Sequence, residues 1–133
     1  TYVKKLQIEA RIIGDMCLSQ VIPAAVRYKN VLIENVKGLK KIFGDDYLSY
    51  CTSEMDALKA ISKYINNMSA DIELLVEARK KANRIENLAQ RAKVYSREVK
   101  DMMERVRESA DNLEMLIDNE MWPLPKYREL LFF

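Results

Sequence analysis

Apolar residues recur at steps of three and four along most of this chain, which is the spacing of one face of an α-helix. The pattern predicts three long helices, at about residues 2–43, 53–82 and 86–121. The second has the most regular steps, as in the contact face of a helical bundle. The apolar positions of the three helices are, in order, Val3, Leu6, Ala10, Ile13, Cys17, Val21, Ala24, Tyr28 and Val31; Met55, Leu58, Ile61, Ile65, Met68, Ile72 and Leu75; and Leu88, Ala92, Tyr95, Val99, Met102, Val106, Ala110, Leu113 and Ile117.

Pro23 lies in the middle of the first predicted helix. Proline has no backbone N–H, and its ring clashes with the carbonyl four residues earlier, here that of Ser19. Because the apolar spacing continues in step on both sides, we expect one long helix with a kink or a short break near Gln20–Ile22.

The first helix is expected to end at Gly44, since glycine adopts the left-handed conformation of a helix end without steric cost. Residues Gly44–Thr52, which include the turn-forming Asp45 and Asp46, are predicted to form a loop. Ser53, with Asp56 three residues later, is predicted to cap the second helix in an arrangement close to a capping box.

The turn between the second and third helices is marked only by Asn83 and Asn87, because no glycine or proline lies there. A single continuous helix would leave two long apolar faces in water, whereas folding back buries them at roughly 25 cal/mol per Å2. The predicted fold is therefore all-α: an antiparallel three-helix bundle in a single domain, residues 1–133.

The tail, residues 122–133, has a different character from the helices. Two prolines one residue apart exclude a helix there and favour an extended chain. We expect the end that holds Trp122 to pack back on the bundle. We expect Leu130–Phe133 to dock on another surface, because exposed apolar patches mark interaction sites. The candidate anchor residues of the tail are Trp122, Pro123, Pro125, Tyr127, Leu130, Leu131 and Phe132.

The composition supports a globular helical domain. Apolar residues make up 49% and charged residues 32% of the chain, and three glycines with three prolines are too few for the turns of an all-β protein.

The net charge is only +2, without the one-sided basic excess of a nucleic-acid binder, so no nucleic-acid partner is expected. We interpret the basic cluster as a solvated helix end in preference to a phosphate-binding site. Its members are Arg79, Lys80, Lys81 and Arg84.

No run of eighteen apolar residues is present, so no membrane span is predicted. Two cysteines, Cys17 and Cys51, do not make a disulfide framework, which favours a reduced, cytoplasmic setting. The first residues predict no signal peptide, and the sequence begins at Thr1 directly in amphipathic sequence. From this start we expect a piece of a longer protein.

Candidate chemistry is sparse. The absence of histidine removes the commonest general base and metal ligand, and three glycines cannot build a phosphate-binding loop. The Asp45–Asp46 pair is interpreted as a polar turn, since a cation site needs more oxygen ligands. Glu9 and Asp15 lie near the apolar face of the first helix, with Arg11 or Arg27 as possible partners. We therefore predict no catalytic, cofactor-binding or metal site in this chain.

The segment Glu120–Phe132, with its Trp-Pro-x-Pro-x-Tyr motif, resembles the C-terminal signature of type III glutamine synthetases. Ile8–Ala10 is similar to the start of that family's last helical region, and Val21–Tyr28 to its proline-interrupted long helix. The stretch Asp111–Leu116 also fits. The resemblance covers nearly the whole chain, and only the proline–aromatic motif within it is specific.

The resemblance implies a larger enzyme that joins ammonia to glutamate with ATP and a divalent metal, Mg2+ or Mn2+, and that assembles as a dodecamer. Its catalytic motifs lie upstream, and none of its active-site residues matches a position of this sequence. The expected role here is a non-catalytic helical module that contacts the catalytic body and neighbouring subunits. Two alternatives stay open: a stand-alone helical adaptor for a partner protein, and, less favoured, a helical metal- or cofactor-dependent enzyme.

Overall fold

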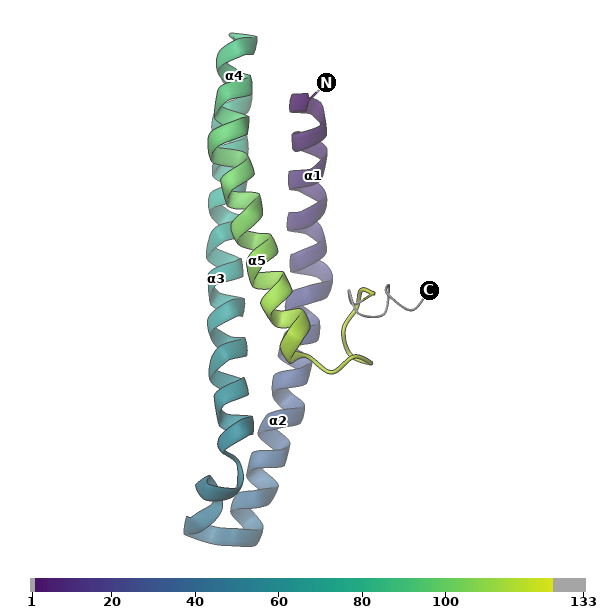
Figure 1. The fold of residues 1–133 in the computed structure, drawn as a ribbon, viewed down its shortest axis with the longest axis vertical. Helices are drawn as coiled ribbons and strands as arrows, with labels where there is room; N and C mark the ends of the chain where they lie inside the picture. Colours follow the sequence, from purple (N-terminus) through teal and green to yellow (C-terminus); the bar gives the residue numbers. More distant parts are fainter. Residues whose placement is uncertain (1, 126–133) are drawn as a thin grey trace.

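The structure, a computed structural model, describes residues 2–125. These residues contain helices and no strand, which confirms the all-α prediction. Three continuous helical arms account for nearly all of them (Figure 1). The first arm is α1 (Tyr2–Met16), the π-helical η1 (Cys17–Val21) and α2 (Ile22–Phe43); the second is α3 (Thr52–Asn83); the third is α4 (Leu88–Val94), the π-helical η3 (Tyr95–Val99) and α5 (Lys100–Leu116).

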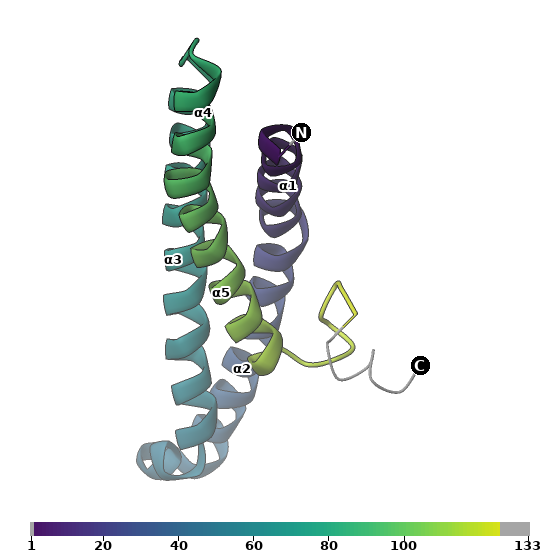
Figure 2. The same ribbon diagram turned by 45° about the horizontal axis from the view of Figure 1, so that its top comes forward.

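The arms lie side by side in an elongated molecule. Figures 1 and 2 show the first arm running the length of the molecule to the 3-10 helix η2 (Gly44–Tyr50), from which α3 returns. The third arm then starts beside the end of α3, and α5 crosses obliquely from α3 toward the junction of α1 and α2. The closest packing is between α3 and α5, while α2 packs on α3, and α1 on α5. The three arms therefore share one core.

The core is built mainly from the apolar rows that the sequence pattern predicted in each arm. The α3 row is buried at its central positions, where both other arms cover it. The fully buried large side chains come from all three arms and the turn between η2 and α3: Tyr95, Ile61, Met68, Leu75, Leu113, Val21, Val99, Val106 and Cys51.

In place of the expected kink or break near Pro23, the arm has the π-helical turn η1, which ends at Val21, two residues before the proline. The arm stays helical through this turn. The N–H of Ile22 donates to the carbonyl of Cys17, five residues back, instead of four. The hydroxyl of Ser19 donates to the carbonyl of Asp15 at 2.6 Å. A π turn widens the helix where the proline ring would otherwise press on the Ser19 carbonyl, so the helix absorbs Pro23 without ending.

The two π turns correct the predicted apolar rows. Val31 is exposed and Leu32 is buried in its place, and Met103 is more deeply buried than Met102. A π turn holds an extra residue, so the buried positions advance by one beyond it. Across both π turns the buried residues are spaced by four and four: Cys17, Val21 and Ala25, then Tyr95, Val99 and Met103.

Two local predictions were wrong at the turn into α3. Residues Gly44–Tyr50 form the 3-10 helix η2 instead of a loop, with Phe43 and Tyr50 stacked ring on ring at 3.9 Å. The helix α3 begins at Thr52, so its capping position is Cys51 and not Ser53, and no side chain caps it. The reason is tertiary: the buried Cys51 sets where the chain enters the core.

Gly44 does end the first arm, with φ 60° and ψ −134°. This backbone resembles the first central position of a type II′ turn, near φ +60° and ψ about −120°, which favours glycine. We expect Gly44→Ala to lower the free energy of unfolding by about 1–2 kcal/mol through backbone strain alone, since a Cβ there meets no atom within 4 Å.

Gly38 is the matched control, because it lies inside α2 and a Cβ there also meets nothing within 4 Å. Gly38→Ala should raise the free energy of unfolding by about 0.5–1 kcal/mol through helix propensity. Urea unfolding of both variants measures the two effects, and equal effects of the same sign would contradict the assigned role of Gly44.

Asn87, one of the two weak turn signals, caps α4: its side chain accepts a hydrogen bond from the N–H of Gln90 at 3.0 Å. Asn83 ends α3, and its side-chain oxygen accepts hydrogen bonds from Gln7 of α1 and from the buried Tyr95. This amide therefore ties the three arms together at the end of the molecule near α4.

The third arm ends at Leu116, before the predicted residue 121. Ile117 turns to extended backbone, and the carbonyl of Asp118 then accepts hydrogen bonds from the N–H groups of Met121 and Trp122, both at 3.0 Å.

Leu88, predicted as buried, is exposed in the first turn of α4. Within residues 2–125, no helix has the length and apolar character needed to cross a membrane.

Candidate functional site

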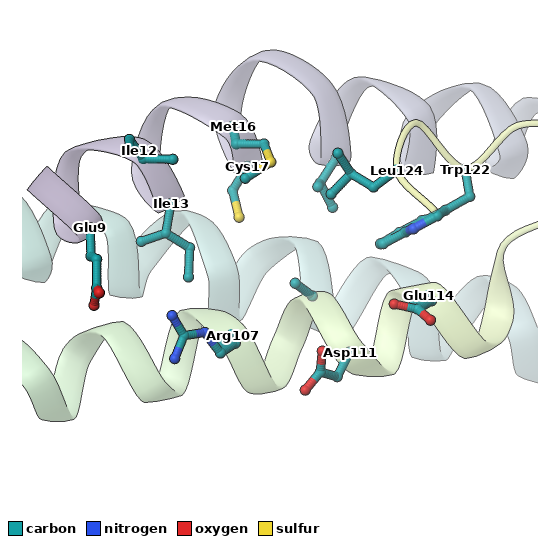
Figure 3. Close-up of a pocket in the computed structure, with 12 residues that line it drawn as sticks. Glu9, Ile12, Ile13, Met16, Cys17, Arg107, Asp111, Glu114, Trp122 and Leu124 are labelled. Atoms are coloured by element: carbon teal, nitrogen blue, oxygen red, sulfur yellow. The ribbon is translucent and has the colours of Figure 1, made fainter. Parts of the chain in front are cut away.

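A groove of about 290 Å3 lies between α1 and α5 (Figure 3). The α1 side supplies Ile12, Ile13 and Met16, and the following residues Cys17 and Val21 continue the wall. The first residues of the tail close one end, where Trp122 and Leu124 reach in between the two helices. Most of the groove surface is therefore apolar.

Charged residues line the same groove on both sides. Arg107, Asp111 and Glu114 follow one another along α5, and Glu9 lies opposite on α1 (Figure 3). Glu9 makes a loose ion pair with the exposed Lys5 at 3.9 Å, and not with the expected Arg11 or Arg27. The lining thus holds three carboxylates and one guanidinium.

Asp111 is the carboxylate of the groove whose pKa is shifted, chiefly by burial. Partial burial raises the pKa of Asp111 above its ordinary value, the neighbouring Glu114 carboxylate raises it further, and Arg107 lowers it. The ionised form of Asp111 is therefore disfavoured by its surroundings, and an added positive charge would stabilise it.

Trp122 contributes a polar atom to this wall. The side chain is 7% exposed and packs against the core, and its indole Nε1 has no hydrogen-bond partner among the described residues. A buried donor without an acceptor costs free energy comparable to a lost hydrogen bond. Among the fully buried side-chain nitrogen and oxygen atoms of residues 2–125, the indole Nε1 is the one that lacks a hydrogen-bond partner.

Cys17 and Cys51 are both free and buried. Burial raises the pKa of the Cys17 thiol from 9.0 to about 11. The unfolded thiol loses its proton near pH 9.0, while the folded one holds it to about pH 11. The unfolded state therefore binds fewer protons in this interval, and stability falls as the pH rises through it.

We expect this titration to cost about 2 kcal/mol of unfolding free energy over that interval, at about 1.4 kcal/mol per pH unit. Denaturant unfolding of the native protein and of Cys17→Ala, measured at both ends of this pH interval, isolates the contribution of the Cys17 thiol. All other groups titrate in both proteins. Identical pH slopes for the two proteins would show that this thiol does not carry the effect.

The structure separates the sequence-predicted tail residues into two groups. Trp122 is buried in the core of the chain, while Pro123 and Pro125 are exposed beside it. Tyr127, Leu130, Leu131 and Phe132 lie outside the described residues. The expectation that Leu130–Phe133 dock on another surface therefore stays a prediction.

Of the charged residues that line the groove, only Glu9 was a candidate in the sequence; Arg107, Asp111 and Glu114 were not. The signal was present in the spacing: Arg107, Asp111 and Glu114 are four and three residues apart, beside the apolar row of Val106, Ala110 and Leu113. What the spacing alone does not indicate is that this charged row faces a second helix. Among the described residues, no three acidic or cysteine side chains converge as a metal site would require.

Comparisons with known proteins point in one direction. Residues 1–40 match the family model described as the glutamine synthetase C-terminal domain. Over 132 residues the chain is 41% identical to a glutamine synthetase of Bacteroides fragilis and 25% identical to a type-3 glutamine synthetase of Dictyostelium discoideum. Over 131 residues it is 28% identical to a glutamine synthetase of Butyrivibrio fibrisolvens. Each match covers 98% of this chain but 18% of the relative, and together they confirm the resemblance seen in the sequence.

Proposed function

We propose that this chain is the C-terminal helical region of a type III glutamine synthetase, and that its role there is structural. The observation that carries the proposal is the match along 98% of the chain to proteins of which it spans about a fifth. By resemblance, the complete enzyme joins ammonia to glutamate to give glutamine, using ATP and Mg2+ or Mn2+. The chemistry would belong to the remaining four fifths of the polypeptide.

A structural role is supported by the lack of converging metal ligands in the part of the chain that the structure describes. The carboxylates of the groove are spread over two helices, and no group of three possible ligands converges in residues 2–125. We therefore assign no step of the parent reaction to this chain.

Its surface supports a role in packing against other parts of an enzyme. Large apolar side chains remain exposed along the arms and where α2 passes into η2, and these include Ile42, Leu48 and the stacked Phe43 and Tyr50. Exposed apolar side chains that gather in one place mark interaction sites. We propose the catalytic body of the same polypeptide and neighbouring subunits of a dodecamer as the partners, in the cytoplasm.

The architecture that fits this role is the antiparallel three-helix bundle with an extended proline–aromatic tail. In this proposal Trp122 holds the tail to the bundle, and Pro123 and Pro125 keep the following chain extended. The residues Tyr127, Leu130, Leu131 and Phe132 then reach the parent enzyme.

A binding experiment tests the anchoring role. The catalytic region would be expressed separately, and its affinity for this chain measured by calorimetry with the native tail and with Leu130→Ala plus Leu131→Ala. We expect binding that the double variant weakens. Met115→Ala, at an exposed position of α5, serves as the control. Absence of binding with every form of the chain would reject the anchoring proposal.

The alternative, a stand-alone adaptor that binds a partner helix in a groove, draws support from the apolar groove between α1 and α5. The length of the native gene product separates the two. A product about five times as long as this chain, as its coverage of the relatives implies, supports the synthetase.

A further inference from the structure

We propose that two copies of this chain pair through the outward faces of their third arms, antiparallel and about a two-fold axis next to Lys100 and Asp101. This pairing places the basic first half of each arm against the acidic second half of the other. The inference deepens the subunit contacts proposed above, and it rests on that function because an assembly of many copies holds such arms at a high local concentration.

Charge is segregated along the third arm, which runs from α4 through η3 to α5. Residues 88–100 contain four basic residues and one acidic residue, whereas residues 101–115 contain five acidic and two basic residues. The chain as a whole has a net charge of only +2. Because unlike charges attract, two such arms are complementary when they lie antiparallel, and they repel each other when they lie parallel.

The spacing of the exposed charges is symmetric about the bond between residues 100 and 101. Counted outward from that bond, the basic side chains are Lys100, Arg97 and Lys93, and the acidic ones are Asp101, Glu104 and Glu108. Both series step by three and then by four residues, which is the spacing of one helical face. Equal numbers of residues from the bond give nearly equal heights along the helix. A two-fold axis there therefore places each basic side chain opposite an acidic one of the other copy.

All six side chains are exposed on the side of the arm that is turned away from the bundle. The residues of the same stretch that enter the core alternate with them in sequence: Tyr95, Val99, Met103 and Val106. Figure 1 shows no other element of residues 2–125 over the near side of α4 and α5. The charged face of the third arm is therefore open to a second molecule in the part of the chain that the structure describes.

Most charges of this face still lack a partner of opposite sign within residues 2–125. Lys93, Arg97 and Lys100 form no ion pair there. Asp101 has a loose one with Arg105 at 3.7 Å, in which both side chains are more than half exposed. The cations of one copy are therefore available to the carboxylates of another.

Two exposed apolar side chains lie at the ends of the charged face. Met115 is 85% exposed and Leu88 is 75% exposed, the two highest values among the large apolar residues that the structure describes. Their separations from the proposed axis differ by two residues, or about 3 Å of helix. The antiparallel pairing therefore brings Leu88 of each copy near Met115 of the other, so that an apolar contact covers each end of the interface.

Exposed ion pairs contribute little each, so we expect a weak dimer whose affinity depends on salt. Sedimentation equilibrium of the whole chain measures it at about 0.05 M and about 1 M NaCl, between which the screening length falls from above 10 Å to about 3 Å. The dissociation constant should rise at least about tenfold at the higher salt concentration. A chain that stays monomeric up to about 1 mM at the lower salt concentration would overturn the proposal.

A charge swap tests the register of the pairing. Arg97→Glu and Glu104→Arg should each weaken the dimer at least about tenfold, because the two-fold symmetry creates each like-charge contact twice. Both changes in one chain restore opposite charges across the interface and should return the dissociation constant to within about threefold of the native value. Lys59→Glu, at an exposed position of α3, changes the net charge as Arg97→Glu does and should leave the dimer nearly unchanged. Failure of the double variant to recover would reject this pairing.

Cross-linking locates the axis. Lys100→Cys places a thiol where the two arms approach each other, and we expect it to give a disulfide-linked dimer at low salt. Lys59→Cys should give little, and the native Cys17 and Cys51 are buried. Circular dichroism verifies that each variant keeps its helical content. A dimer that Lys100→Cys does not cross-link uses another surface and defeats the proposal, while the binding of the tail to the catalytic region is measured separately and stands or falls by itself.

Discussion

Replacing Leu113 with alanine is expected to lower the free energy of unfolding by about 3 kcal/mol, within the roughly 2–5 kcal/mol measured for leucine-to-alanine changes in protein cores. Leu113 is fully buried on α5, in the core that this helix shares with α3 and α1. The loss combines the transfer free energy of the removed methyl groups with the cavity that remains.

Met115 provides the matched control two residues away on the same helix. It is 85% exposed, so Met115→Ala should change the free energy of unfolding by no more than about 0.5 kcal/mol. Urea unfolding followed by circular dichroism measures both variants. If Leu113→Ala were as mild as Met115→Ala, α5 would not pack in the arrangement described.

Trp122→Ala is the second change with a large expected effect, a loss of about 3 kcal/mol, at the lower end of the range for tryptophan-to-alanine substitutions. Although Trp122 lies beyond the last helix, it is buried and packs against the core residues of the arms. The substitution opens the end of the groove between α1 and α5 to water, because Trp122 and Leu124 close that end.

Trp122→Phe keeps an aromatic ring and removes the unpartnered indole N–H. It should cost about 1 kcal/mol, because lost packing is partly offset by removal of a buried polar group. Thermal unfolding of both variants tests the order of the two effects. A tryptophan held only by a partner protein would leave the unfolding of this chain unchanged in both.

The core positions could be predicted from the sequence, whereas the groove could not. Ile61, Met68 and Leu75 were recognisable as core positions because an amphipathic helix must bury the face on which its apolar residues recur. Asp111 and Glu114 look like ordinary surface carboxylates in the sequence. Only the position of α1 opposite them, and of Trp122 at the end, turns them into groove residues.

The sequence by itself determined the helical class, the three arms, the end of the first arm at Gly44 and the family resemblance. These features follow from local rules: the helical spacing of apolar residues, the backbone freedom of glycine, and a sequence motif that is recognised without knowledge of tertiary contacts. Tertiary structure decided the start of α3 beside the buried Cys51, the end of the third arm at Leu116, and the groove. It also decided which residues the two π turns bring to the core, since an extra residue in a helical turn is retained only where packing on other arms compensates for it.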